Sequence, residues 1–409
     1  MNSSQLFEIA LGLSSPWYIE RIEFTKTEDH CRQLDIHLRY QRGSRFKDSS
    51  GHDCPIHDSV DRKWQHLNFF EHRCYLHGRV PRIKATDGKV EQVQVPWARP
   101  QSGFTLLFEA YSMLLIENEM PVNKAAGTLQ VYPQRLWTIF NYWLKRAHLN
   151  DDQASVSALG IDETSSKRGH DYLTLAVDLD RKKVIYACEG KDEQTVVKLK
   201  NHLDSKGVQS NQIKHVSMDM SPAFISGVSK NFPQASIVFD RFHVTKMLNE
   251  AVDKVRNGEA RLHRAIKGHK YTFLKHNRNL SAEKLKTKYE LMDAYPALGE
   301  VVRLRELFND YWEFSDVEQA AAFLSYWCDI AQDSKIQPII KFSNTIKAHW
   351  SGIINYVQRK ISNGILEGIN SKIQLAKRRA RGYRNKTNFI NMIYFIAGKL
   401  KFDYPQYFT

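Results

Sequence analysis

The sequence predicts an α/β protein, a mixed β-sheet flanked by helices with an all-helical insertion. Between residues 151 and 257, three neighbouring strand-like runs are followed by two strand–helix units. Residues 258–345 show only the helical spacing of apolar side chains, in the ranges 282–294, 297–312 and 317–330. A chain of 409 residues, 42% of them hydrophobic, has the length of about two to three globular domains.

The first block, residues 1–100, predicts short strands and turns. Strand-like runs at Leu34–Tyr40 and Cys74–Val80 flank a turn-rich loop between residues 41 and 53. Cys54 and His57 resemble one half of a zinc knuckle, and a structural zinc site needs four ligands in two close pairs. A second pair is not evident. Both a zinc ribbon and a metal-free ribbon therefore stay open.

Residues 101–150 predict a helix-turn-helix. Apolar side chains recur with helical spacing over 104–117, a short helix and a Gly-containing turn follow, and Pro133 begins another helix. One side of that last helix is apolar, and the other is polar and basic, with Arg135 and Lys145. Two packed helices that bind no DNA would show a similar pattern.

The α/β elements follow in order. Strands are expected at 157–162, 172–179, 184–188, 215–219 and 236–240, and helices at 195–203, from Pro222, and from Phe242 to about Arg256. The final region is helical and basic. We therefore expect a core domain at 151–257 and 346–409, interrupted by a helical insertion at 258–345.

The charge balance points to a polyanionic partner. Lys and Arg number 59 against 45 Asp and Glu, a net charge of +14, and nucleic acid is the usual partner of such a surplus. A basic protein that is merely soluble is the alternative. No apolar run has the roughly 18 residues that a membrane span needs. Five scattered cysteines imply no disulfide framework, so a cytoplasmic location is expected.

Three acids stand where they could bind metal. Asp162 and Asp219 each end a predicted strand, and Glu367 lies on the polar face of a helix expected to begin near Ser362. Nine Lys and Arg surround Glu367 between residues 359 and 386. Carboxylates suit Mg²⁺, and basic side chains attract a phosphate backbone. A single strand-end aspartate is otherwise most often a helix or turn cap.

Four motifs resemble those of bacterial insertion-sequence transposases of the DDE type. They are Gly160-Ile161-Asp162-Glu163, Met218-Asp219-Met220-Ser221, Asp240-Arg241-Phe242-His243, and the stretch Asn363-Gly364-Ile365-Leu366-Glu367-Gly368-Ile369-Asn370. The resemblance covers nearly the whole chain. It implies an N-terminal zinc-ribbon-like domain, a helix-turn-helix and an RNase H-like catalytic core with a helical insertion. The chain departs from the family pattern in residues 84–87, which contain no cysteine.

The resemblance also implies roles for single residues. Asp162, Asp219 and Glu367 would form a catalytic triad that binds two Mg²⁺ ions, for which Mn²⁺ can substitute. His243 would contact substrate phosphate or orient the site, the alternative being a helix-cap Asp240 beside a packed histidine. The expected DNA contacts after the glutamate are Lys372, Lys377, Arg378, Arg379, Arg381 and Arg384, unless this run is only a solvated helix face.

The function implied is transposition. The protein would bind the terminal inverted repeats of its element, cleave the ends by two-metal-ion hydrolysis and join them to target DNA by transesterification. It would act on nucleoid DNA as an oligomer, at least a dimer. A repressor with an inactive core and an RNase H-like junction nuclease are the alternatives. Trp312, Trp327 and Trp350 in the helical insertion are expected to pack in the core rather than to stack on a base.

Overall fold

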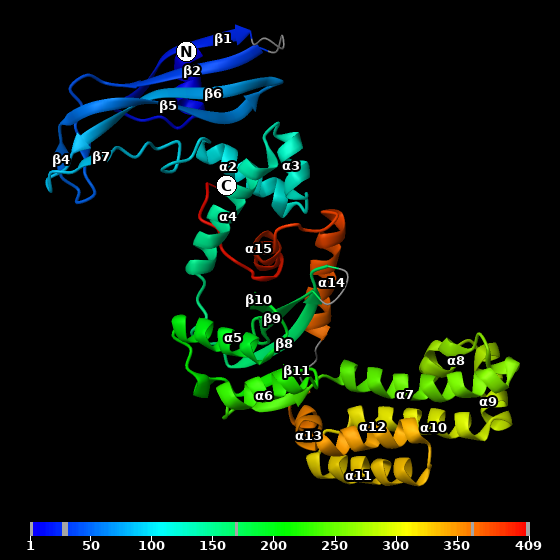
Figure 1. The fold of residues 1–409 in the computed structure, drawn as a ribbon. Helices are drawn as coiled ribbons and strands as arrows, with labels where there is room; N and C mark the ends of the chain where they lie inside the picture. Colours follow the sequence, from blue (N-terminus) through cyan, green and yellow to red (C-terminus); the bar gives the residue numbers. More distant parts are fainter. Residues whose placement is uncertain (1–2, 27–31, 168–170, 361–363, 406–409) are drawn as a thin grey trace. The chain divides into compact units, whose positions relative to one another are not determined.

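The computed structural model describes residues 3–26, 32–167, 171–360 and 364–405, which form two compact units. Unit 1 contains the described residues up to Leu149 together with those from Lys401 onward, and unit 2 contains those from Asn150 to Leu400 (Figure 1). The sequence analysis assigns all of 346–409 to the core. The last segment instead packs within unit 1, because Asp403 pairs with Arg146 and the Tyr404 ring meets Trp143 edge-on.

Unit 1 begins with helix α1 (Ser3–Ala10) and a five-stranded sheet. Its order is β1-β2-β6-β5, with β7 on β6, and β2 and β6 run parallel. Alternate side chains of β2 and β6, such as Leu34 and Leu76, are fully buried, as the strand period requires. The strands are β1 (Trp17–Lys26), β2 (Arg32–Tyr40), β5 (Ile56–Phe69), β6 (His72–Lys84) and β7 (Val90–Gln92). Of these, β2 and β6 contain the two predicted runs and are longer than them.

The helices of unit 1 agree with the predicted helix-turn-helix in all but the turn. They are α2 (Leu106–Glu117), α3 (Val122–Thr128) and α4 (Pro133–Leu149). Gly127 lies inside α3, and the left-handed turn residue is Gln130, with φ of 54°. The expected Gly-containing turn is therefore wrong. The Gln130 amide donates to the Gly127 carbonyl at 3.1 Å, which closes the turn without glycine there.

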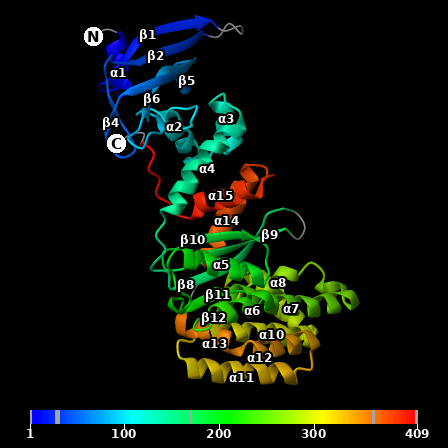
Figure 2. The same cartoon turned by 60° about the vertical axis from the view of Figure 1, so that its left-hand side comes forward.

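Unit 2 is built on a mixed sheet of the predicted kind. Its strand order is β10-β9-β8-β11-β12, antiparallel from β10 to β8 and parallel from β8 to β12. Helices α5 and α6 cover one face, and α14 and α15 lie on the other (Figures 1 and 2). The strands are β8 (Ala158–Ser165), β9 (Tyr172–Asp178), β10 (Lys183–Glu189), β11 (His215–Met218) and β12 (Ser236–Phe239). The helices are α5 (Glu193–Ser205), α6 (Pro222–Asn231), α14 (Gly364–Arg379) and α15 (Lys386–Ala397).

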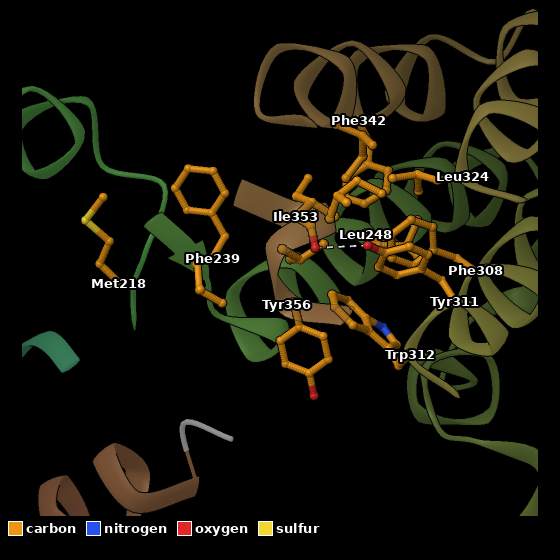
Figure 3. Packing of buried hydrophobic residues seen from close by; sticks show 14 of the residues in the cluster. Met218, Phe239, Leu248, Phe308, Tyr311, Trp312, Leu324, Phe342, Ile353 and Tyr356 are labelled. Atoms are coloured by element: carbon orange, nitrogen blue, oxygen red, sulfur yellow. Dashed lines mark hydrogen bonds between the residues drawn. The ribbon is translucent and has the colours of Figure 1, made fainter. Parts of the chain in front are cut away.

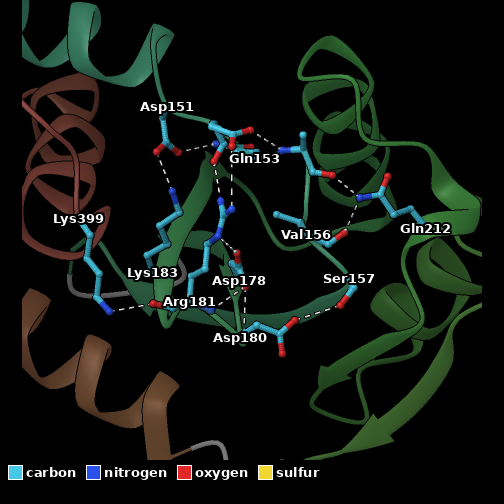
Figure 4. Close-up of polar contacts among 12 residues, drawn as sticks. Asp151, Gln153, Val156, Ser157, Asp178, Asp180, Arg181, Lys183, Gln212 and Lys399 are labelled. Carbon is cyan, nitrogen blue, oxygen red and sulfur yellow. Dashed lines mark hydrogen bonds and ion pairs between the residues drawn. The ribbon is translucent and has the colours of Figure 1, made fainter.

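Polar contacts fix the segment that leads into β8 (Figure 4). The Lys183 ammonium pairs with Asp151 at 2.7 Å, and both side chains are largely buried. Arg181 donates to the carbonyl of Asp152 at 2.7 Å and accepts from Lys399 through its own carbonyl at 2.8 Å. The β9–β10 turn is thereby tied to the start of β8 and to the end of unit 2.

The chain between β12 and α14 is helical. Its α-helices are α7 (Arg241–Leu262), α8 (Lys270–Leu274), α9 (Ala282–Ala294), α10 (Pro296–Asp310), α11 (Val317–Asp333), α12 (Gln337–Ala348) and α13 (Trp350–Arg359). The predicted boundaries at 257 and 345 fall inside α7 and α12, because the buried face of α7 continues to Ala260. No helix in the described parts of the chain is long and apolar enough to span a membrane.

One apolar core joins these helices to the sheet (Figure 3). The Tyr311 hydroxyl donates to the carbonyl of Ile353 at 2.9 Å, which links α13 to the turn after α10. Trp312 and Trp327 are 3% and 0% exposed, which confirms that they pack in the core, and Trp350 is partly buried against it. Burial on this scale makes the helical region part of the same folded body as the sheet.

A neutral histidine supports the start of α2 in unit 1. Thr105 caps α2 by accepting from the Phe108 amide at 3.2 Å, and its hydroxyl lies within hydrogen-bond distance of His66 Nδ1, 2.8 Å away. Burial lowers the pKa of His66 to about 4. Between pH 6.5 and 4 the unfolded chain therefore binds the proton first, and unit 1 loses stability as the pH falls.

We predict that α2 in the wild type loses about 1–3 kcal/mol of protection between pH 7 and pH 4.5. Hydrogen exchange of the amides between Thr105 and Glu117 in the full chain measures this loss. The His66→Gln variant cannot gain the proton, so its protection should fall less. Equal pH dependence in the two proteins would contradict the assignment.

Candidate active site

Three aspartates end up at one level of the sheet in unit 2. Gly160 of β8 pairs with Ser217 of the parallel strand β11, so Asp162 and Asp219, each two residues further on, come side by side. The amide of Asp240 donates to the carbonyl of Met218 at 3.0 Å, which brings the end of β12 to the same level. The motifs around residues 162, 219 and 240 therefore meet at one edge.

Asp162 does not end its strand, contrary to the sequence analysis. β8 continues to Ser165, because β9 pairs with it as far as Tyr172, whereas its pairing with β11 covers only Ala158 to Gly160. Asp162 thus lies just after Gly160, where the pairing of β8 with β11 ends. It lies on a strand that is still held from the other side.

The surroundings of Asp162 work against its negative charge. Burial, together with the smaller effect of the charges of Asp240 and Asp219, raises its pKa to about 6. The amide of Glu163, which donates to Asp162 Oδ1 at 2.8 Å, and the nearby His243 act in the opposite direction. A carboxylate in this state is stabilised by an added cation.

His243 takes part in this cluster from the first turn of α7. Its Nε2 lies 3.6 Å from Asp240 Oδ2, and Asp240 caps α7 by accepting from the amide of Phe242 at 2.9 Å. Asp240 is therefore a helix cap, as the alternative interpretation in the sequence analysis expected. The same contacts place the His243 ring within electrostatic reach of Asp162.

Glu163 is an acid of this cluster that the sequence analysis did not select. Burial raises its pKa, Lys191 lowers it, and Asp219 and Asp162 raise it. The signal for it was present in the sequence, since it directly follows Asp162 at the end of an apolar run.

Glu367 lies on α14, which docks against β8. The predicted polar face is confirmed, since Glu367 is exposed, while Leu366, Ile369 and Ile373 on the other side of the helix are buried. The residue of α14 that contacts Asp162 is Asn370, which donates to Asp162 Oδ2 at 2.5 Å. Ser362 and Asn363, which belong to the predicted helix start and motif, lie outside the described residues.

The donor set suits a hard divalent cation. Within the described ranges, no three His, Cys, Asp or Glu side chains are close enough to hold a metal by themselves. Mg²⁺ commonly takes only one or two carboxylates and completes its shell with water and substrate phosphate. Asp162 and Asp219 offer only oxygen atoms as ligands. A bound Mg²⁺ ion would relieve the repulsion between the two carboxylates.

The basic segment after Glu367 divides into two groups. Lys372, Arg378, Arg379, Arg381 and Arg384 are exposed, on α14 and on the turn that follows it. Lys377 is instead turned to β8, where its ammonium donates to the carbonyl of Ser165 at 2.7 Å, and burial lowers its pKa.

The two DNA contacts expected in the helix-turn-helix lie on the surface of α4. Arg135 is exposed and lies over the ring of Phe104 at 4.1 Å. Lys145, ten residues further along the same helix, is also exposed. Beneath them, the fully buried Glu109 accepts from Trp143 Nε1 at 2.8 Å and from Arg99 Nε at 2.9 Å. This buried carboxylate ties α4 to α2.

The two candidate zinc residues have different surroundings. His57 is exposed on β5, whereas Cys54 is buried with its sulfur 3.7 Å from Asp48 Oδ2. Asp48 accepts from the amide and hydroxyl of Thr86 and from the amide of His52, and the last of these does most to lower its pKa. Asp48 thus joins the β3–β4 hairpin (β3 Phe46–Lys47, β4 Asp53–Cys54) to the turn before β7.

Comparison with known proteins agrees with this geometry. A transposase domain model of the ISL3 group matches residues 159–393, and a model described as the helix-turn-helix domain of transposase family ISL3 matches residues 93–144. These matches define the class of protein, a transposase of the insertion-sequence type. The first match covers more than half of the chain, so the protein belongs to the ISL3 family of transposases.

Two curated relatives extend over almost the whole chain. The transposase for insertion sequence element IS1001 of Bordetella parapertussis is 28% identical over 393 residues, covering 93% of this chain and 95% of the relative. The transposase for insertion sequence element IS1557 of Mycobacterium tuberculosis is 26% identical over 427 residues, covering 94% and 93%. The similarity therefore includes unit 1 as well as the sheet of unit 2.

The exposed arginines at the end of α14 and on the turn after it lead to a prediction about DNA binding. Each phosphate contact that is lost reduces the slope of log affinity against log salt by about 0.9. We expect the double variant Arg378→Ala/Arg384→Ala to lose roughly two units of that slope, measured by fluorescence anisotropy of a labelled duplex between 50 and 200 mM salt. The matched variant Lys284→Ala/Lys286→Ala, on the exposed face of α9, should keep the wild-type slope. Identical slopes in all three proteins would show that Arg378 and Arg384 do not contact the DNA phosphates.

Proposed function

We propose that this protein binds the terminal inverted repeats of its insertion sequence, cleaves the ends and joins them to target DNA. The observation that carries the proposal is the meeting of Asp162 and Asp219 at one level of neighbouring parallel strands, where burial and mutual repulsion raise the pKa of Asp162. The helix-turn-helix, with Arg135 and Lys145 on its surface, would read the ends. Cleavage and joining would take place on the nucleoid DNA of the cytoplasm.

The domain organisation is part of the proposal. An RNase H-like core is supported by the strand order β10-β9-β8-β11-β12 and its change from antiparallel to parallel. We propose a zinc-ribbon-like domain at 1–100, a helix-turn-helix at 101–150 and a core with a helical insertion, whose expected boundaries at 257 and 345 lie inside α7 and α12 and whose last segment, from Lys401, packs within unit 1. In this scheme the insertion belongs to the core body, because α10 and α13 share its apolar cluster.

The acids would act through Mg²⁺. Asp162, Asp219 and Glu367 would hold two ions, which, when bound, stabilise the charge on the attacking and leaving oxygens of a phosphodiester. The chain's own part would be to hold both aspartates at one level through the strand register, and to favour the charged form of Asp162 through the Glu163 amide and His243. His243 would also contact the scissile phosphate or orient Asp240.

The bond changes balance in both steps. In the first, water attacks the phosphodiester at an element end, a P–O bond breaks and a 3′-OH is released. In the second, that 3′-OH attacks a target phosphodiester, and one P–O bond forms for each that breaks, so no external energy source is needed. Because two ends must be joined to one target, we propose that the protein works as a homo-oligomer, at least a dimer, on double-stranded DNA.

We predict that Asp162→Asn and Asp219→Asn each lower end cleavage by about 10³-fold, since the loss of several kcal/mol of charge stabilisation corresponds to that factor. Cleavage and strand transfer are measured with the full chain, Mg²⁺ and duplexes carrying the element ends. End binding in a mobility shift should stay near the wild-type level. Asp204→Asn, an exposed substitution on α5, is the matched control and should remain active.

The same assay separates the two alternatives. A junction nuclease would cut branched DNA without forming a joined product from pre-cleaved ends. A repressor with an inactive core would bind the ends, and its effect in cells would be the same in wild type and Asp162→Asn. Full cleavage by both aspartate variants would refute the proposed function.

A further inference from the structure

β8 has an open edge beside the candidate active site. Its pairing with β11 ends at Gly160, whereas its pairing with β9 continues to Ser165. Backbone carbonyls on the β11 side therefore have no strand partner after Gly160. Such groups need another donor when they are buried.

Helix α14 supplies these donors through its side chains. Asn370 donates to the carbonyl of Glu163 at 3.4 Å, and Gln374 donates to the carbonyl of Ser165 at 3.1 Å and to Thr164 Oγ1 at 2.9 Å. Lys377 donates to the Ser165 carbonyl as well, at 2.7 Å. The three side chains, spaced i, i+4 and i+7, share one helix face, and we call them the α14 zipper.

Gly160 permits the helix to lie this close to the strand. A Cβ atom at Gly160 would come within 3.0 Å of Leu366 Cδ1 and 2.9 Å of Leu179 Cδ2. Leu366 immediately precedes Glu367. Helix α14 is therefore held on β8 at two places: by the packing of Leu366 over Gly160, and by the zipper further along the helix.

Asn370 is the member of the zipper that reaches a proposed metal ligand. Its amide donates to Asp162 Oδ2 at 2.5 Å, while Asp162 Oδ1 accepts from the Glu163 amide. The reverse orientation of the amide would set its oxygen against a carboxylate and a carbonyl, with no hydrogen between them. Asn370 Oδ1 thus faces away from Asp162 and is buried, with no hydrogen-bond partner within the described parts of the chain.

We propose that Asn370 is a positioning residue of the active site. It fixes the carboxylate of Asp162, and with Gln374 and Lys377 it holds α14, the helix that carries Glu367, on β8. This inference rests on the proposed function. It also assigns Lys377 to the zipper rather than to direct contact with DNA.

The experiment compares Asn370→Ala, Gln374→Ala and the matched control Ser371→Ala, an exposed polar residue of the same helix. Residues that orient metal ligands typically contribute 10–100-fold to metal affinity. We expect the Mn²⁺ dissociation constant of the full chain with end DNA, measured by electron paramagnetic resonance, to rise at least tenfold in Asn370→Ala. Gln374→Ala should show a smaller rise, and Ser371→Ala should match the wild type.

Two further readouts separate positioning from a general loss of fold. Hydrogen exchange at residues 161–165 and 364–379 should quicken in the zipper variants, while the amides of α10 and α11 keep their protection. High Mg²⁺ should restore part of the cleavage by Asn370→Ala and none by Asp162→Asn. Wild-type Mn²⁺ affinity and exchange in both zipper variants, with Asp162→Asn inactive, would overturn this inference alone, whereas an active Asp162→Asn would overturn the proposed function beneath it.

Discussion

The parallel pairing of β8, β11 and β12 is the constraint on which the candidate site depends. Register alone brings Asp162, Asp219 and Asp240 to one level, and backbone hydrogen bonds hold them there against their mutual repulsion. The compensating groups are fixed as well: an amide on Asp162 and His243 at the start of α7. The sheet thus imposes an arrangement of charge that the side chains alone would avoid, and cations relieve that arrangement.

The unequal lengths of the strands matter as much as their direction. β8 extends five residues beyond its last pair with β11, and the edge left open lies next to Asp162. A third strand there would cover the carboxylate. Helix side chains satisfy the carbonyls instead, and a helix can bring an acid of its own to the site. One local feature therefore leaves room beside Asp162 for α14, the helix that carries Glu367, which is some 200 residues away in the sequence.

Apolar runs and helical spacing were enough to predict a mixed sheet in unit 2, the helices between β12 and α14, and the polar face of α14 that carries Glu367. They could not place Asp162 inside its strand, because that depends on how far β9 extends. The role of Lys377 was also inaccessible, since a lysine in a basic helix predicts a solvated charge unless the carbonyl opposite it is known. The position of Asp162 within β8 and the contact of Lys377 both depend on pairing between segments that are distant in the sequence.

In unit 1 a carboxylate cross-links two turns. In a ribbon with four cysteines, zinc ties one hairpin turn to another. Here Asp48 accepts from amides of its own hairpin and from Thr86 in the opposite turn, and these donors lower its pKa. The cross-link is present where Asp48 is ionised in both states, and it weakens as the pH falls below the ordinary aspartate pKa of about 4. A cross-link of this kind depends on pH, because its acceptor is a carboxylate.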